Sequence, residues 1–481
     1  MKGANMGMPR DDTVGERKST RKNVACVAVV LILLLGARIA WKLHADYQLR
    51  QVLDQIAARG EPIHLAGFAS KPIPDEENAA ELYREAVRAM APLRAYVDKR
   101  RVVGVGGGSS SFVTALAGHE GFRREKAGSV QKILTLARPA LDLSRKAGSL
   151  SKVDWKFELD ESCVSEDTIS VRRGLEPLAR VLRLAAIEAH DRGTDASALD
   201  HLFDMMAFAK SVDSMPTGGI SHVFSTIVWR HTVMAIETIA PRLRVGTGER
   251  TATDEQLDRL IHEILNETVS AKAHVMTYVY YRCLEYDGIQ RRQRGQRSLG
   301  DGGWIQDETF LPWVKRIFLG PMLTTERTEL LRDRTAVVSA ATRHRFPGAG
   351  VEVRYRDFFA FHFSSLAIRR MAAVAPAIRR YESDLKKRPE ALTDLVPRYL
   401  PAVPEDPFDP DGAPIAYLPD STPPVLYSVS EDGVDDLGAF RRVKSRELGR
   451  KWKIPDLVFF LNGNRPTPKP RMVTEKRDKR P

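Results

Sequence analysis

The segment NVACVAVVLILLLGARIAWKL, residues 23–43, is an almost uninterrupted apolar run that decides the topology of the chain. Its unbroken core, residues 24–37, is shorter than the roughly 20 residues that a helix needs to cross a bilayer. The whole segment reaches that length because the long side chains of Arg38 and Lys42 can extend to the lipid headgroups. Trp41 lies where an interfacial aromatic residue is expected. The sequence therefore predicts a transmembrane anchor over 23–43.

Basic residues in front of this segment set its expected orientation. Arg17, Lys18, Arg21 and Lys22 precede it, and positive charge stays on the cytoplasmic side of a membrane. We expect residues 1–22 to form a basic cytoplasmic tail, with the bulk of the chain periplasmic or otherwise extracytoplasmic. The alternative is a cleaved signal peptide, but its only cleavage site, at 35–37, is weak and no cysteine follows it. An uncleaved single-pass membrane anchor is favoured.

Charge and composition exclude several classes of protein. With 481 residues, 43% of them hydrophobic, the chain can bury a sizeable core and is neither disordered nor a disulfide scaffold. Residues 1–22 carry +3 and residues 441–481 carry +10 of the net charge of +12, which leaves 23–440 at −1. The final segment, 463–481, is predicted to be a basic disordered tail. It has no aromatic residue for stacking on bases, so we expect no nucleic-acid partner.

Apolar residues recur at helical spacing through most of the body, 44–385. The strongest block, 171–275, is divided by a polar turn at 191–195 and by a break at 216–219, after which Ser221 is expected to cap a helix. Thr253 and Gln256 form a capping box that opens the next helix. Further helices are expected over 45–58, 75–97, 321–343 and 355–385. The predicted fold class is mostly α, with an α-hairpin helical body outside the membrane.

No catalytic motif stands out in this body. His262 and Glu263 begin a zinc-protease pattern, but Asn266 occupies the position of its second histidine. Ser149 and Lys152 match S-x-x-K without its companion motifs. An acidic segment around Trp155, residues 154–167, is expected to be a solvated loop. We therefore predict that the chain is not an enzyme and needs no cofactor.

Two cysteines lie beyond the predicted membrane segment. Cys163 and Cys283 would share an extracytoplasmic compartment, where a disulfide can persist. The favoured alternative is that they are two unrelated buried thiols. Their spacing alone does not choose between these possibilities.

Residues 386–462 form a different kind of module. Ten prolines lie between 389 and 424, so no long helix can form there. A short helix at 390–396 is expected, followed by strands at 413–417, 425–429 and 456–461 that form a small antiparallel sheet. The sequence predicts a C-terminal α+β module.

The order of motifs in this module resembles the globular end of the major pseudopilin of type II secretion. The shared motifs are Arg388-Pro389-Glu390-Ala391-Leu392, Asp406-Pro407-Phe408, Ala413-Pro414-Ile415-Ala416-Tyr417, Leu426-Tyr427-Ser428, Asp432-Gly433 and Asp435-Asp436. The wider layout, with the segment PDEENAA at 74–80, is similar to that of uncharacterised membrane-anchored bacterial envelope proteins. The chain departs from a pilin subunit, because a basic internal helix precedes the module and the anchor lacks a prepilin processing site.

The pseudopilin resemblance implies a calcium site at Asp432, Asp435 and Asp436. Carboxylate oxygens are ligands that calcium prefers. Leu437 interrupts the ending usual in the resembling proteins, and the alternative is a polar hairpin turn.

For the whole chain we expect a binding or scaffold protein of the cell envelope, anchored in the membrane by its N-terminal helix and bound to an envelope protein partner. The alternative is an envelope hydrolase whose active site is assembled from dispersed residues.

Overall fold

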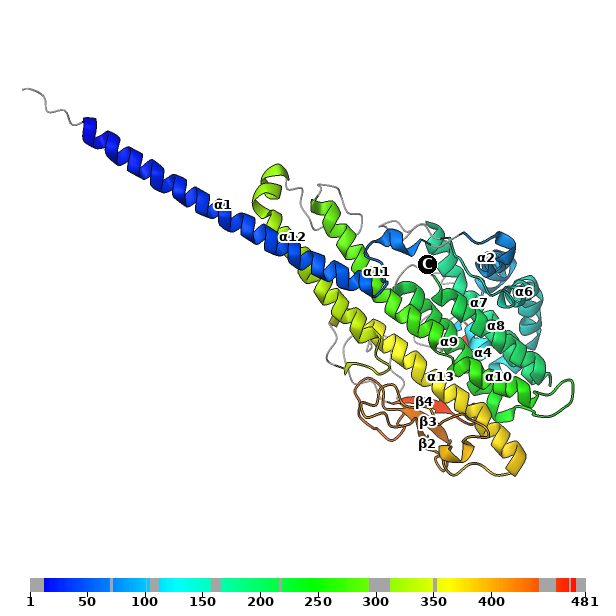
Figure 1. The fold of residues 1–481 in the computed structure, drawn as a ribbon. Coiled ribbons are helices and arrows are strands. Elements are labelled where there is room, and N and C mark those ends of the chain that lie inside the picture. The colour runs from blue at the N-terminus through cyan, green and yellow to red at the C-terminus, as the bar shows by residue number, and fades with distance from the viewer. Residues whose placement is uncertain are drawn as a thin grey trace, which may run out of the picture. The chain divides into compact units, whose positions relative to one another are not determined.

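A computed structural model describes the chain except for residues 1–12, 70–71, 101, 104–111, 157–165, 216–218, 294–311, 349–352, 441–455, 467–468 and 473–481. The described chain is predominantly helical, with a small antiparallel sheet near its C-terminal end, which confirms the predicted fold class (Figure 1). The chain divides into two compact units, Met1–His64 with Arg282–Asp333 and Leu65–Tyr281 with Arg334–Pro481.

The α-helices are α1 (Thr13–Ala58), α2 (Ala79–Ala89), α3 (Ala91–Val97), α4 (Phe112–Gly118), α5 (Glu120–Glu125), α6 (Ala127–Gly148), α7 (Glu166–Asp191), α8 (Asp195–Asp213), α9 (Gly219–Ile239), α10 (Asp254–Leu265), α11 (Thr268–Gln293), α12 (Pro312–Ala341) and α13 (Val353–Leu385). Short 3-10 helices are η1 (Leu65–Phe68), η2 (Asp75–Glu77), η3 (Ala240–Arg242) and η5 (Leu392–Leu395). The strands are β1 (Val102–Val103), β2 (Ala416–Leu418), β3 (Val425–Ser428), β4 (Leu457–Phe460) and β5 (Arg471–Met472).

In the first unit, α1 is a single continuous helix that changes character along its length (Figure 1). Its apolar half carries exposed side chains, among them Ile32 at 68% and Leu33 at 66% of their full exposure. Further along, Val52 and Ile56 are buried against Tyr286 of α11 and a leucine of α12. A helix that is apolar on all sides and unburied suits a lipid environment, whereas its amphipathic continuation packs as predicted for 45–58. This helix is compatible with a single-pass membrane anchor.

The cysteine at the edge of the first unit is not part of a disulfide. Cys283 is buried and free, and its thiol donates a hydrogen bond to the carbonyl of Pro62 at 3.1 Å. Burial raises the pKa of this thiol to about 12, so it stays protonated. Cys163 lies outside the described residues.

The second unit is built on consecutive helices that pack against one another. α7, α8 and α9 contact each other in turn, and α13 packs on both α9 and α10. The predicted turn at 191–195 and the capping box are confirmed, the latter by paired bonds between Thr253 and Gln256 at 3.1 and 3.2 Å. Ser221 is not a cap, because α9 begins at Gly219 and buries Ser221 within its first turn.

The C-terminal segment folds as a three-stranded antiparallel sheet in the order β2-β3-β4, beside α13 (Figure 1). Strand residues Leu426 and Phe459 belong to the same buried cluster as Met371 of α13. Asp406 holds the loop before β2 against the end of β3. Its carboxylate accepts hydrogen bonds from the Ser428 hydroxyl at 2.8 Å and from the backbone amide of Val429 at 2.9 Å. The module therefore shares one core with the helices of its unit.

Several described residues of the segment 463–481, which was expected to be a disordered tail, form defined contacts. Arg465 forms two hydrogen bonds with the buried carboxylate of Glu237, at 2.8 and 2.9 Å. Strand β5, Arg471–Met472, pairs with β1. The correction has a simple cause: a buried carboxylate needs a cationic partner, and Arg465 is within reach.

Candidate metal centre

The three aspartates predicted to bind calcium lie in the turn after β3, and the side chains of Asp432 and Asp435 support that turn. Asp432 accepts a hydrogen bond from the amide of Val434 at 3.2 Å, and Asp435 accepts one from the amide of Leu437 at 2.8 Å. Asp435 also accepts a bond from the Tyr427 hydroxyl at 3.3 Å. Hydrogen bonds that a backbone amide donates to the aspartate side chain two residues earlier are typical of Asx turns.

A fourth carboxylate that sequence reasoning missed lies beside this turn. Asp456 is buried at the start of β4 and accepts a hydrogen bond from the amide of Gly438 at 2.8 Å. Its second oxygen has no hydrogen-bond partner. Burial, followed by the nearby charges of Asp435 and Asp436, raises the pKa of Asp456. The turn thus concentrates negative charge, as a calcium site would.

Three histidines of the second unit form a group that the sequence did not indicate. His222 of α9, His274 of α11 and His362 of α13 place one ring nitrogen each within 4.8 Å of the others. All three are buried, with 4%, 1% and 4% of their surface exposed. We call these three residues the histidine cluster.

Hydrogen bonds and stacking hold the histidine cluster together. The Nδ1 atom of His222 lies 2.9 Å from a carboxylate oxygen of Asp213, and its Nε2 atom lies 3.0 Å from Nδ1 of His362. The ring of His274 stacks on that of His362, with centroids 3.9 Å apart and planes at 6°. Because a carboxylate only accepts hydrogen bonds, Nδ1 of His222 carries the proton in this network. Nε2 of His222 therefore has a free electron pair, which accepts a hydrogen bond from Nδ1 of His362.

Aromatic side chains enclose His274. The rings of Tyr278 and Phe359 meet it edge to face, with centroids at 5.0 and 4.9 Å. Neither ring nitrogen of His274 has a hydrogen-bond partner. Burial, together with the charge of neighbouring histidines, holds the pKa of His274 and of His362 well below the usual value. These rings are therefore neutral, the form in which imidazole binds metals.

Sequence spacing could not reveal this cluster, because its members come from three helices. Metal-site patterns in sequence detect histidines three or four apart on one helix. One local signal does exist: His362 lies in the run FFAFHF, residues 358–363, where a polar residue interrupts an apolar helix face.

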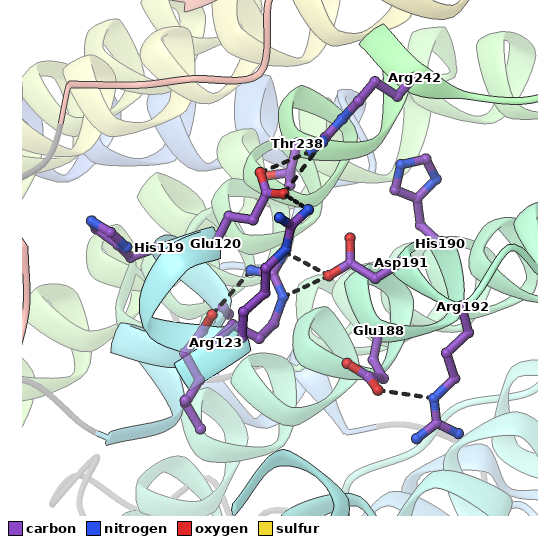
Figure 2. Close-up of polar contacts among 12 residues, drawn as sticks. His119, Glu120, Arg123, Glu188, His190, Asp191, Arg192, Thr238 and Arg242 are labelled. Carbon is purple, nitrogen blue, oxygen red and sulfur yellow. Dashed lines mark hydrogen bonds and ion pairs between the residues drawn. The ribbon is translucent and has the colours of Figure 1, made fainter. Parts of the chain in front are cut away.

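A second polar group, drawn in Figure 2, links α5, α7 and η3. Arg123 pairs with Asp191 at 2.7 Å, and Arg242 pairs with Glu120 at 3.1 Å. The hydrogen bond from Arg242 lowers the pKa of Glu120. Each carboxylate of these pairs is matched by a guanidinium, so the group ties helices together and has the character of a structural network.

The other segments considered in the sequence also have structural roles. The hydroxyl of Ser149 donates to the carbonyl of Lys146 at 2.7 Å, and Lys152 pairs with Glu77, so the S-x-x-K match is not an activated nucleophile. The acidic segment is not fully solvated, because Asp154 is 9% exposed. Its neighbour Trp155 is buried and donates to the carbonyl of Ser211 at 2.8 Å. The side chains of residues 157–173 lie outside the described part.

A cavity of about 220 Å³ lies between η3, α13 and β4, away from the histidine cluster. Its charged lining residues are Arg379, Glu382 and Arg388. Glu382 pairs with Arg388 at 2.9 Å and lies 3.6 Å from Arg379, so a single carboxylate is shared by two guanidinium groups and the lining keeps a net positive charge.

Comparison of the chain with family models, with curated proteins and with solved structures finds no match.

Proposed function

We propose that the chain is a single-pass membrane protein with a cytoplasmic N-terminus, whose folded units act outside the cytoplasm by binding another protein of the cell envelope. The observation that carries the anchor is the unburied apolar half of α1. Residues 23–43 of a straight helix span about 31 Å, which matches a hydrocarbon layer of about 30 Å. The basic residues at 17–22 favour this orientation.

The continuity of α1 supports an anchor over a cleaved signal. The helix runs without a break from Thr13 to Ala58, and its final turns are buried against α11 and α12. Cleavage near residue 37 would cut this helix in its middle and remove the segment that precedes the packed turns.

The binding role is favoured over a dispersed hydrolase site by burial. Three titratable histidines do converge, which is the kind of arrangement that a hydrolase would need. Each of them is at most 4% exposed, however, so their nitrogens are not presented to a substrate at the surface. The only carboxylate that lines the described cavity, Glu382, is already engaged by two arginines.

Topology is tested with epitopes at the two ends of the full chain in intact spheroplasts. We expect the protein to resist alkaline extraction, with the C-terminal epitope accessible to external protease and the N-terminal epitope protected. A matched variant with glutamine at Arg17, Lys18, Arg21 and Lys22 should lose this uniform orientation, since the charge bias is removed. Release of a soluble chain lacking residues 1–37 would refute the anchor.

The binding role is tested by crosslinking in intact cells, followed by purification in detergent. A specific envelope protein recovered at constant stoichiometry supports it. Recovery of the uncrosslinked chain alone, together with hydrolytic activity of the purified protein, would favour the enzyme.

A further inference from the structure

Unpaired polar atoms concentrate around the histidine cluster. Both ring nitrogens of His274, one carboxylate oxygen of Asp213 and the hydroxyl of Tyr278 are buried without a hydrogen-bond partner. Each such group costs free energy when it is removed from water, on the order of 1–3 kcal/mol. Several unpaired groups at one place in a core indicate that a ligand satisfies them.

We propose that His222, His274 and His362 bind one divalent transition-metal ion of the zinc class. The expected ligand atoms are Nε2 of His222, Nδ1 of His362 and one ring nitrogen of His274. Two nitrogens bound to a tetrahedral ion at about 2.0–2.1 Å lie about 3.3 Å apart. The observed separation of 3.0 Å between the first two atoms, within a group spanning at most 4.8 Å, is close to that geometry.

Asp213 is the positioning residue of this site. Its carboxylate oxygen lies 2.9 Å from Nδ1 of His222, so it keeps the proton on that nitrogen and directs the electron pair of Nε2 towards the ion. A carboxylate that orients a histidine ligand in this way is a regular feature of zinc sites. The side chain of Asp213 is completely buried, and its negative charge partly compensates the charge of a divalent ion.

Metal binding requires a small rearrangement of the rings. His274 and His362 are parallel and stacked, whereas an ion must lie in the plane of each ring that binds it. One ring must therefore turn about its Cβ–Cγ bond, a torsion with a broad energy minimum. His362 must also move its proton from Nδ1 to Nε2, which breaks its present bond to His222.

The surroundings favour a nitrogen-binding ion over calcium or magnesium. The ligand group contains imidazoles only, and imidazole suits zinc, copper, nickel and iron, whereas calcium and magnesium prefer oxygen. Two nearby cations oppose a bound ion, and only that of Arg370 is paired with a carboxylate. Arg369 donates to Ser270 at 2.8 Å, and Arg370 pairs with Glu267 at 2.8 Å.

A bound ion would connect α9, α11 and α13 directly. Because the ion binds only the folded arrangement of these helices, it should stabilise the native state in proportion to its concentration over its dissociation constant. The inference is independent of the proposed membrane topology.

The test uses the full chain in detergent without a histidine tag. After chelation and removal of the chelator, the protein is titrated with Zn²⁺ against a chromophoric competitor and, separately, with Co²⁺. We expect one ion per chain, a rise in melting temperature, and visible cobalt absorption typical of tetrahedral coordination. His274→Gln and His362→Gln should weaken binding at least 100-fold. Asp213→Asn should weaken it about 10–100-fold, as expected for an orienting carboxylate.

His231→Gln is the matched control, because His231 is also a buried histidine of α9 but lies outside the histidine cluster, with its Nε2 atom 4.0 Å from a carboxylate oxygen of Glu176. It should leave zinc binding unchanged. Folding of every variant is checked by helical circular dichroism. If the ligand variants do not fold, X-ray absorption of the zinc-loaded wild type decides, with three histidine nitrogens at about 2.0 Å supporting the site. Wild-type protein that binds no stoichiometric zinc, or folded ligand variants that retain it, would overturn the proposal.

Discussion

Asp195 is a buried charged residue whose substitution should have a large and pH-dependent effect on stability. Its side chain is fully buried at the start of α8. One oxygen lies 2.6 Å from Nδ1 of His190, and the other accepts hydrogen bonds from the backbone and side chain of Arg244 at 2.8 and 2.7 Å. The carboxylate therefore joins the end of α7, the start of α8 and the loop after η3. We predict that Asp195→Asn destabilises the fold at neutral pH.

The magnitude follows from the pKa of this carboxyl group. Burial acts to raise the pKa of Asp195, but the hydrogen bonds from His190 and Arg244 outweigh it and lower the pKa from 3.8 to about 2. One pKa unit corresponds to about 1.4 kcal/mol, so the ionised form contributes about 2 kcal/mol to the free energy of unfolding. Because the folded-state pKa is lowered, this contribution is complete above about pH 4 and is lost as the pH falls towards 2. About half of it is lost by pH 3.

The assay is urea unfolding of the detergent-solubilised chain at pH 6 and pH 3, followed by tryptophan fluorescence. Asp195→Asn should lower the free energy of unfolding by about 2 kcal/mol at pH 6 and by about half as much at pH 3. Asp142→Asn, which removes the same charge from an exposed position of α6, should change it by less than about 0.5 kcal/mol at either pH. A difference between wild type and Asp195→Asn that does not shrink on acidification would refute this reasoning.

Three further predictions concern other contacts. A Cβ at Gly174 would lie 2.1 Å from a methyl group of Val87, so Gly174→Ala should cost about 1–3 kcal/mol of stability by overpacking, and adding Val87→Ala should recover part of the loss in a thermal melt. Glu237→Gln should lower stability by about 1–3 kcal/mol, because it removes the charged acceptor of Arg465, and proteolysis should then cleave the C-terminal segment faster. If the turn at 432–436 binds calcium, millimolar calcium should raise the melting temperature of wild type but not of Asp435→Ala. An equal midpoint with calcium and with chelator in both proteins would leave the turn structural.

Local signals in the sequence predicted local structure well. The capping box at Thr253 and the turn ending at Asp195 depend on side chains within a few residues of the backbone that they organise, so spacing alone reveals them. The strands of the C-terminal module were predicted for the same reason, since prolines exclude helix and apolar runs remain between them. Ser221 shows the limit: a capping residue type followed by an apolar run was present, but α9 begins two residues earlier.

Contacts between distant segments could not be read in this way. Arg465 appeared to be one of many basic residues in a tail, because its partner Glu237 lies in another helix. The histidine cluster could not be predicted for the same reason, because residues 222, 274 and 362 come together only when α9, α11 and α13 pack. Periodicity shows which face of a helix is buried but not which residues of other helices meet it there.

The buried polar groups of this chain fall into two kinds, and the difference bears on function. At Asp195 and Glu237 every charge has a partner of opposite sign, and such networks are explained by the fold that they hold together. At His274 the ring nitrogens remain unpaired although the side chain is 1% exposed and meets the rings of Tyr278 and Phe359. Burying polar atoms without hydrogen-bond partners costs free energy, and an apolar residue of similar size at this position would avoid that cost. The unpaired imidazole of His274 is therefore better explained by what the histidine cluster binds than by a contribution to the stability of the fold.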